Sequence, residues 1–348
     1  MTVTVRSFAK INLGLYIGAR RADGFHDLRT VYQTIALHDV IRVKVGRGAG
    51  IEILCTDSRV PCDHSNTCHR IAERVLDELD TSGKVTIEIE KRLPVQGGLG
   101  AASSNAVATM LAMERALKKR LTQAARLRIA AAVGSDLPLF LVGGTALGVG
   151  RGEEVYPLPD LPSLPLVVVT PEVGVSTPTA FADWDALSAG ELSSAPPTIR
   201  STRSPGIPAA DAIELTASRA SDRLFEVGRA LSAWLTAKDL PHTGAPVRNG
   251  SRAGSLLLDL VRTGIENDFE KVVFPQYPEL RDIKAALERI GAVYASLSGS
   301  GSTLYGLFRT RAAAAAAVQR LSRQGLIARP ATTLTRAQYW TKSLVAGR

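Results

Sequence analysis

The stretch PVQGGLGAASSN at residues 94–105 decides the fold prediction, because it joins a strand-like segment to a long helical one through a run of glycines. Those glycines let the backbone adopt positive φ and approach a ligand without a Cβ in the way. Ser103 and Ser104 then open the helix, whose first N–H groups and positive dipole end suit a phosphate. The stretch therefore predicts a cradle for an anion at the start of a helix.

Two better-known phosphate-binding loops do not fit this stretch. A Walker A loop, GxxxxGK[ST], carries a lysine after its last glycine, and none stands there. The dinucleotide fingerprint GxGxxG fails at its last position, which is Ser103, and no clean strand–helix–strand unit with a distal acidic residue follows. A Gly-rich turn capped by serine remains as the plain structural alternative.

The segments around this loop predict an α+β protein with two domains. Early strands are followed by helices that pack on them, which differs from a regular βαβ alternation. A proline-bounded linker at 157–165 places the domain boundary at about residue 165, giving a first domain over 1–165 that contains the glycine-rich stretch and a second domain over 166–348. Period-two and helical spacing predict strands at 2–6, 10–16, 31–36, 40–45, 85–90, 164–170, 292–297 and 303–308, and helices at 66–79, 104–117, 124–132, 277–290 and 312–321.

Two segments of the second domain have the composition of exposed insertions. Residues 188–210 are rich in Ser, Pro and Ala, and residues 241–254 are rich in Gly, Pro and polar side chains. We therefore predict that both are insertions within residues 166–348.

The composition is that of a globular protein with an anionic partner. The 348 residues carry a formal net charge of +9, and 45% of them are hydrophobic. Nucleic acid, a membrane surface or a polyphosphate substrate would each fit this charge. However, the basic residues are scattered and aromatic residues make up 5%, which offers little for stacking on nucleic-acid bases. No segment has the apolar length of a membrane span, and three cysteines imply no disulfide framework, so we expect a cytoplasmic protein.

The loop at 94–105 resembles the second signature of the GHMP kinase superfamily. The stretch AKINLGL at 9–15 resembles the first signature, and LSGSGST at 297–303 resembles the third. This resemblance implies a two-domain fold, with an N-terminal domain like ribosomal protein S5 domain 2 and a ferredoxin-like C-terminal α/β domain. It also implies transfer of the γ-phosphoryl group of ATP to a hydroxyl, with Mg²⁺ accompanying the ATP.

Four stretches narrow the resemblance to one branch of the superfamily. They are AKINL at 9–13, RRADGFH at 20–26, KRLP at 91–94 and GSDLPLF at 134–140. This branch phosphorylates an alcohol of the non-mevalonate isoprenoid pathway, a methylerythritol that carries a cytidine diphosphate. The resemblance thus implies a small-molecule substrate, no nucleic-acid or membrane partner, and a monomer or weak homodimer. Another GHMP enzyme of the homoserine or mevalonate type is the main alternative, and an RNA-binding protein is a remote one.

The resemblance assigns roles to individual residues. Asp136 would take the proton from the attacking hydroxyl, and Lys10 would hydrogen-bond Asp136 and keep it ionised. The substrate would be held by Asn12 near its methylerythritol or diphosphate end, and by Phe25, His26, Thr177 and Phe181 around the cytosine. The ATP-binding residues would be Asn66, Lys91, Pro94, Gly97, Gly98, Leu99, Gly100, Ala101, Ala102, Ser103, Ser104, Gly299 and Gly301, with Ser104 as a possible Mg²⁺ contact.

Several of these residues have plainer interpretations. Asp136, between Ser135 and the proline at 138, could simply cap a helix. Phe25 could be a core residue, and a Phe at this position stacks on a base without offering a phenolic hydrogen bond. The cysteines and histidines between residues 55 and 69 lack the CxxC or HxxxH spacing of structural zinc sites, so we predict no metal centre there.

Overall fold

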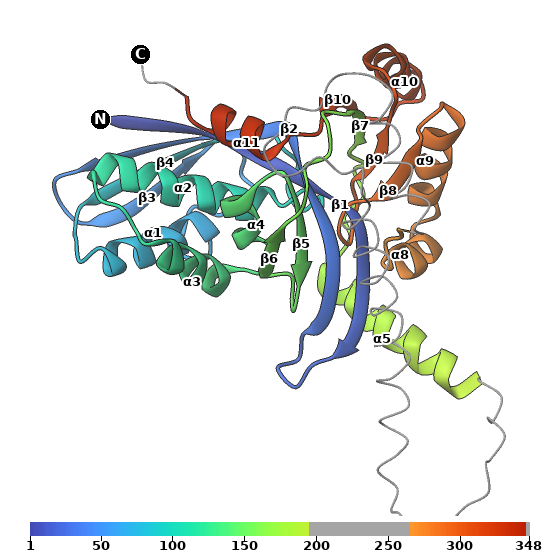
Figure 1. The fold of residues 1–348 in the computed structure, drawn as a ribbon, viewed down its shortest axis with the longest axis horizontal. Coiled ribbons are helices and arrows are strands. Elements are labelled where there is room, and N and C mark those ends of the chain that lie inside the picture. The colour runs from blue at the N-terminus through green and yellow to red at the C-terminus, as the bar shows by residue number, and fades with distance from the viewer. Residues whose placement is uncertain (195–264, 346–348) are drawn as a thin grey trace, which may run out of the picture.

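The computed structural model describes residues 1–194 and 265–345, and within these ranges it shows an α+β fold with two sheets (Figure 1). The α+β prediction is therefore confirmed. No helix in the described ranges has the length and apolarity needed to cross a membrane. The predicted insertion at 241–254 lies outside the described residues, as does most of the one at 188–210.

The first sheet has six strands from the N-terminal half of the chain. Its order is β3-β4-β2-β5-β6, with β1 paired to β2, and the β3–β4 pair is parallel while the other pairs are antiparallel. The strands are β1 (Thr2–Arg20), β2 (His26–Gly46), β3 (Gly50–Cys55), β4 (Lys84–Glu90), β5 (Thr145–Val149) and β6 (Glu154–Pro157).

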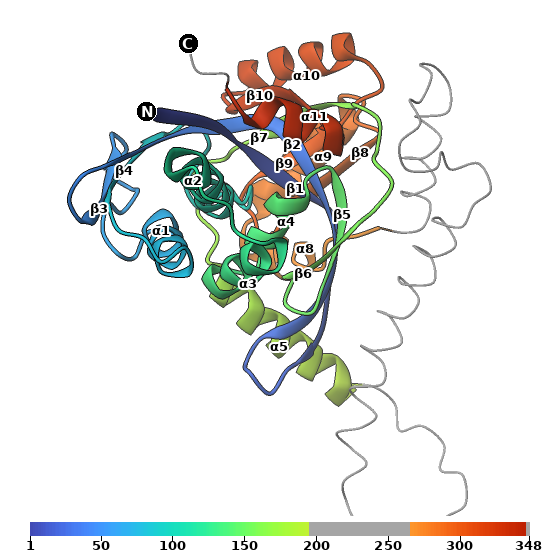
Figure 2. The same cartoon turned by 60° about the vertical axis from the view of Figure 1, so that its left-hand side comes forward.

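Four helices cover one face of this sheet: α1 (Thr67–Glu78), α2 (Ala101–Leu117), α3 (Gln123–Val133) and α4 (Leu137–Val142) (Figure 2). α2 is the central one, because side chains around its whole circumference, Met110 among them, are buried. A helix that is apolar all round must lie inside a core. This burial fixes the position of the helix start. It also fixes the position of the glycine-rich loop before it, at residues 94–105, which is called the glycine loop below.

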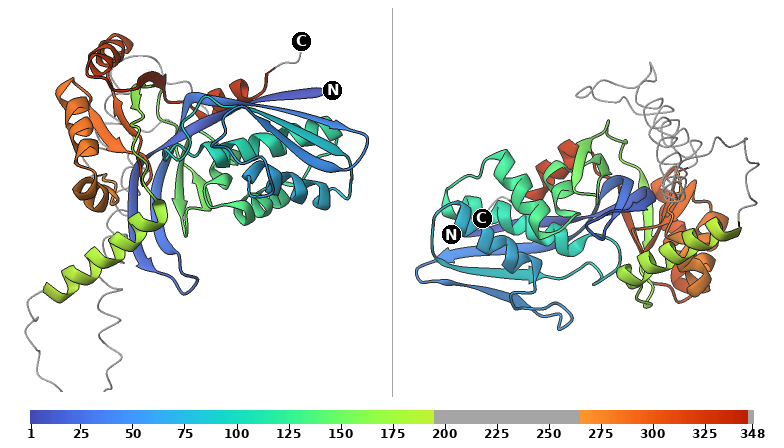
Figure 3. Two further views of the ribbon diagram at one scale, coloured as in Figure 1. Left: turned by 180° about the vertical axis from the view of Figure 1, so that it is seen from behind. Right: turned by 90° about the horizontal axis from the view of Figure 1, so that it is seen from below.

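The second sheet has the antiparallel order β10-β7-β9-β8. The helices that pack against this sheet come from the chain before residue 195 and from the chain after residue 264 (Figure 3). The first of these, α5 (Thr177–Ser194), includes the start of the predicted insertion at 188–210. The elements are β7 (Pro165–Val169), α5, α8 (Glu270–Gln276), α9 (Pro278–Arg289), β8 (Tyr294–Leu297), β9 (Leu304–Leu307), α10 (Arg311–Arg323) and β10 (Ala328–Thr332).

The β1–β2 hairpin differs from the sequence prediction and links the two sheets. Four short strands were predicted at 2–6, 10–16, 31–36 and 40–45, whereas the chain forms two long strands of 19 and 21 residues. Register shifts interrupt their pairing at three points and allow the ribbon to bend without ending. As a result, Val5 packs in the core of the first sheet, while Leu15 and Ile17 pack in the core of the second.

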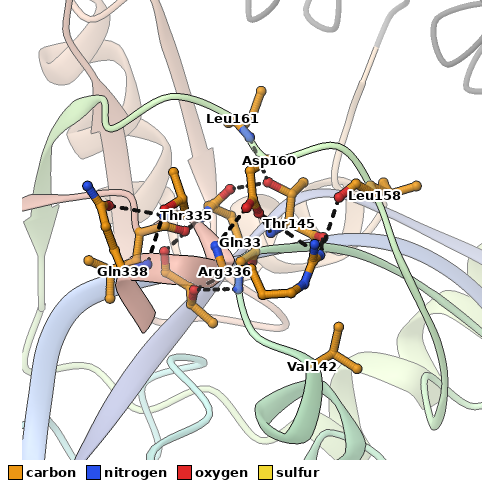
Figure 4. Close-up of polar contacts among 12 residues, drawn as sticks. Gln33, Val142, Thr145, Leu158, Asp160, Leu161, Thr335, Arg336 and Gln338 are labelled. Atoms are coloured by element: carbon orange, nitrogen blue, oxygen red, sulfur yellow. Dashed lines mark hydrogen bonds and ion pairs between the residues drawn. The ribbon is translucent and has the colours of Figure 1, made fainter. Parts of the chain in front are cut away.

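The last helix, α11 (Arg336–Ser343), returns to the first sheet (Figure 4). The Arg336 guanidinium donates to the carbonyl of Thr145 at 2.8 Å, and its backbone N–H donates to Asp160 at 2.8 Å. Tyr339 donates its hydroxyl to the carbonyl of Phe140 on α4 at 2.7 Å. The C-terminal end of the chain thus packs against α4 of the N-terminal half. The domain boundary at about residue 165 stays a prediction.

Candidate active site

The glycine loop ends in a helix start that no described side chain caps. Gly100 is the N-cap of α2 and has a left-handed φ of 67°. The helix begins at Ala101 rather than at the predicted residue 104, so Ser103 and Ser104 lie inside its first turn. The first N–H groups of a helix have no partner within it, and here they are left to a ligand. This local geometry is that of an anion site.

Two of the loop glycines are required by close contacts. Gly98 has φ of 74°, and a Cβ at that position would lie 2.0 Å from the backbone oxygen of Ser298. A Cβ on Gly100 would lie 3.0 Å from Cγ of Lys10. Ser298 also donates its hydroxyl to the carbonyl of Gly98 at 3.0 Å. The loop is thus held between Lys10 and the turn that follows β8.

A cavity of about 350 Å³ opens on one side of the loop. Asn66 caps α1 there by accepting from the N–H of Cys68 at 2.8 Å, and it also donates to the carbonyl of Pro61. Both contacts hold the chain around the cavity. Of the predicted ATP-binding residues, the cavity is lined by Asn66, Lys91, Pro94, Gly97, Gly98, Leu99, Gly100, Ala101, Ala102 and Ser103.

Lys91 is anchored by Asp39, a residue that the sequence analysis missed. The Asp39 carboxylate is fully buried and accepts from Nζ of Lys91 at 2.7 Å. It also accepts from the N–H groups of Arg92 and Leu93 and from the amide of Asn105. These four donors satisfy a buried charge, so Lys91 borders the cavity as a neutralised and fixed side chain.

A second cavity, of about 720 Å³, opens on the other side of the loop. It shares Gly98 and Gly100 with the first one. The loop therefore borders both spaces. Of the predicted residues, this cavity is lined by Lys10, Asn12, Phe25, His26, Gly98, Gly100, Asp136, Thr177, Phe181 and Gly299.

Lys10 and Asp136 meet at the wall of the larger cavity. Nζ of Lys10 lies 3.4 Å from Oδ2 of Asp136 and 2.7 Å from Oδ1 of Asn12. The Lys10 side chain is 4% exposed and that of Asp136 is 33% exposed, so the carboxylate is the member of the pair that a ligand can reach. The buried ammonium of Lys10 thus supplies the Asp136 carboxylate with a counter-charge.

Tyr32 is a third member of this cluster that the sequence analysis missed. Its hydroxyl donates to Oδ1 of Asp136 at 3.0 Å, and its ring lies 5.7 Å from Nζ of Lys10. Burial raises the pKa of Tyr32 well above its ordinary value, and the charge of Asp136 acts in the same direction. Tyr32 therefore remains a hydrogen-bond donor to the carboxylate. It lies in the first half of β2, where its position in the sequence gives no sign of a polar partner.

The helix-cap interpretation of Asp136 does not explain its side chain. Asp136 does precede α4 at the N-cap position, but its carboxylate makes no capping hydrogen bond. Pro138 stands in the first turn and has no N–H to offer. The carboxylate turns instead toward Lys10 and Tyr32 at the cavity wall.

Aromatic side chains line part of the larger cavity, but their arrangement differs from the predicted one, in which Phe25, His26 and Phe181 surround the cytosine. The rings of His26 and Phe181 stack directly on each other, with centroids 4.9 Å apart and planes inclined by 8°. A base held between two rings needs about 7 Å, or two stacking distances, so it does not fit between this pair. Phe25 is half exposed at the rim, with the Arg151 guanidinium 4.9 Å from its ring, and keeps a face for stacking.

Three other predicted site residues, Thr177, Ser104 and Gly301, lie in different parts of the fold. Thr177 and Ser300 share a hydrogen bond of 2.7 Å, which ties α5 to this turn. Ser104 and Gly301 line neither cavity, contrary to expectation. Ser104 is buried, and its hydroxyl donates to the carbonyl of Phe8 at 2.7 Å, which joins α2 to β1.

Comparison with known proteins identifies relatives along most of the chain. The family models "GHMP kinases N terminal domain" and "GHMP kinases C terminal" match residues 66–144 and 251–326. The 4-diphosphocytidyl-2-C-methyl-D-erythritol kinase of Solibacter usitatus is 35% identical over 318 residues, which are 91% of this chain and 84% of that protein. The enzyme of the same name from Moorella thermoacetica is 35% identical over 305 residues, 88% of this chain and 90% of that protein.

Solved structures agree with these relatives. A 4-(cytidine 5'-diphospho)-2C-methyl-D-erythritol kinase superposes with a TM-score of 0.66 at 26% identity, covering 95% of this chain and 98% of that one. A homoserine kinase from Cytophaga hutchinsonii superposes with a TM-score of 0.65 at 20% identity, covering 96% and 95%. At that lower identity the second match shows the fold alone.

Proposed function

The chain belongs to the 4-diphosphocytidyl-2-C-methyl-D-erythritol kinase family of the GHMP kinases, and we propose that it transfers the γ-phosphoryl group of ATP to the 2-hydroxyl of that cytidine-bearing alcohol. The activity is that of EC 2.7.1.148, a step of the non-mevalonate isoprenoid pathway. Homoserine- and mevalonate-type substrates are not favoured, because relatives that are 33–35% identical over 84–90% of their own length carry the cytidyl-substrate name.

One observation supports phosphoryl transfer more strongly than any other. The loop glycines Gly98 and Gly100 border both cavities, and the Lys10–Asp136 pair stands in the larger one. A nucleotide with its phosphates on the loop would therefore present its terminal phosphate toward an acceptor in the other space. Such positioning, combined with fixed charges, is the main requirement of phosphoryl transfer.

In the proposed mechanism Asp136 is the general base. The acceptor oxygen attacks the γ-phosphorus, the bond between that phosphorus and the bridging oxygen of ADP breaks, and the hydroxyl proton passes to the Asp136 carboxylate. Tyr32 and Lys10 orient the carboxylate before the transfer. Lys10 also places a positive charge where negative charge moves during the reaction.

The nucleotide is proposed to bind in the smaller cavity. The uncapped N–H groups at the start of α2 would donate to its phosphates, and the helix dipole adds about half a positive charge there. Asn66 and Lys91 line the space beyond the loop, which the adenine would occupy. Ser104 is not part of this proposal through its side chain, since that hydroxyl faces β1.

Mg²⁺ is proposed to arrive with the ATP. No group of three or more His, Cys, Asp or Glu side chains in the described ranges could hold a metal ion. This fits an ion that is held chiefly by nucleotide phosphates and water. When bound, Mg²⁺ would neutralise charge on the phosphates that the α2 start already attracts.

The proposal is tested by a coupled assay of ADP release with the cytidyl alcohol, homoserine and mevalonate as acceptors. We expect turnover with the cytidyl alcohol alone, and the Asp136→Asn variant should bind ATP normally while turnover falls by about 10²- to 10⁴-fold. Asp282→Asn, an exposed change on α9, is the matched control. Turnover with homoserine or mevalonate but not the cytidyl alcohol would refute the substrate, and near-normal turnover of Asp136→Asn would refute the base.

A further inference from the structure

Two residues of α5 hold the imidazole of His26 from two sides. Phe181 stacks on the ring, and Asp185, one helical turn later, accepts a hydrogen bond from Nε2 at 2.7 Å. Figures 1 and 3 show α5 beside the tip of the β1–β2 hairpin, where His26 begins β2. The His26 side chain is 6% exposed, so this contact is shielded from water on most sides.

The hydrogen bond to Asp185 determines which ring nitrogen carries the proton. A carboxylate can only accept, so Nε2 must be the donor. In the neutral ring, Nδ1 is then left as an acceptor. Within the described ranges Nδ1 has no hydrogen-bond partner, and it is not among the buried unsatisfied atoms. His26 and Asp185 both line the larger cavity, where Nδ1 is the ring nitrogen available to a ligand.

We propose that Asp185 is a specificity-determining positioning residue, which makes Nδ1 of His26 accept a hydrogen bond and so selects a base with an N–H donor at that point. This inference rests on the proposed function, since it assumes that the base of the substrate lies at His26. Cytosine presents an exocyclic amino group as donor, whereas uracil presents a carbonyl oxygen in its place. Two acceptors facing each other would leave both without a partner, which favours cytosine.

The surroundings of Asp185 support a positioning role. Its second oxygen lies 3.9 Å from the guanidinium of Arg20, which also lines the cavity, so the carboxylate is held from two sides. Phe181 in turn packs edge-to-face against Phe269, with ring centroids 4.9 Å apart. The imidazole is therefore fixed in both position and proton distribution before a ligand binds. Asp185 itself acts through His26 and needs no contact with the base.

The test compares kcat/KM for the cytidyl substrate with kcat/KM for its uridyl analogue. In Asp185→Asn the amide can donate to Nε2, which moves the ring proton to Nδ1 and turns that nitrogen into a donor. We expect the cytidine-to-uridine ratio to fall by about 10- to 100-fold, mainly through KM, since this corresponds to one mispaired hydrogen bond. Asp185→Glu should restore much of the preference, because a carboxylate again accepts from Nε2.

Asp183→Asn is the matched control, because Asp183 lies on the same helix and instead accepts from Gln276 at 2.7 Å. Its ratio should equal that of the unmodified protein. ¹⁵N NMR of labelled histidine gives a readout besides activity: the unprotonated nitrogen of His26 should be Nδ1, and should become Nε2 in Asp185→Asn. An unchanged ratio in Asp185→Asn would overturn the inference, as would an Nδ1-protonated neutral ring in the unmodified protein. Absence of turnover with both substrates would instead count against the proposed function.

Discussion

Replacing Gly98 by alanine tests whether the glycine loop and the turn after β8 form one unit. The added Cβ would lie 2.0 Å from the backbone oxygen of Ser298, on a residue whose φ is 74°. Backbone atoms cannot rotate away as the end of a side chain can. Either the loop or the turn must therefore move, and both border the space between Lys10 and the proposed phosphate site.

The expected magnitude has two parts. A left-handed φ costs an alanine about 1–2 kcal/mol, which is offset by about 0.4–1 kcal/mol because alanine restricts the unfolded chain. The clash adds about 1–3 kcal/mol, as in other overpacked sites. Gly325→Ala isolates the first part, because Gly325 has φ of 81° with nothing within 4 Å of its added Cβ. The two variants should therefore differ in stability by about 1–3 kcal/mol.

Urea unfolding of both variants measures this difference, and a coupled assay measures KM for ATP. We expect Gly98→Ala to be the less stable variant and to raise KM for ATP at least about tenfold, because the N–H groups at the start of α2 are displaced. Gly325→Ala should leave KM unchanged. If the two variants had equal stability and equal KM, the loop would not be packed against Ser298 and our account of the phosphate site would be wrong.

Two further substitutions test residues that the structure revealed. Tyr32→Phe removes the hydrogen bond that Tyr32 donates to the Asp136 carboxylate. In a steady-state assay kcat should therefore fall by about 10- to 100-fold while KM for ATP is unchanged. An unaltered kcat would show that Tyr32 does not orient Asp136. Asp39→Asn leaves the Lys91 ammonium buried without a counter-charge, so urea denaturation should show that the free energy of unfolding falls by about 3–5 kcal/mol. An unchanged unfolding midpoint would show that Asp39 does not neutralise a buried Lys91.

The stretch at 94–105 predicted its own local structure well, because its determinants are local. Glycines next to a helix-forming run produce left-handed residues and a helix start whatever the rest of the fold. Even so, the helix begins at Ala101, and Ser104 turns its hydroxyl to Phe8 on β1. That contact joins residues 96 positions apart, which no local pattern reveals.

Strand lengths were predicted less well. Pairing between β1 and β2 continues through three register shifts, and each shift interrupts the period-two pattern by which a strand is recognised in sequence. The long hairpin that results carries Lys10 and Asn12 on one strand and Tyr32 on the other. The pairing brings Tyr32 directly opposite Asn12, a neighbour relation that depends on tertiary structure alone.

The sequence by itself determined the family and the reaction type, and it predicted the residue pair Lys10 and Asp136, because short motifs within a few residues of chain carry the resemblance to the family. Only the tertiary structure decided what surrounds them. Asp136 receives its donor from Tyr32 on β2, Lys91 its counter-charge from Asp39, and His26 its proton position from Asp185 on α5. Hydrogen bonds and ion pairs act over about 3 Å in space, irrespective of separation along the chain. Partners such as His26 and Asp185, 159 positions apart, therefore become visible only once the chain has folded.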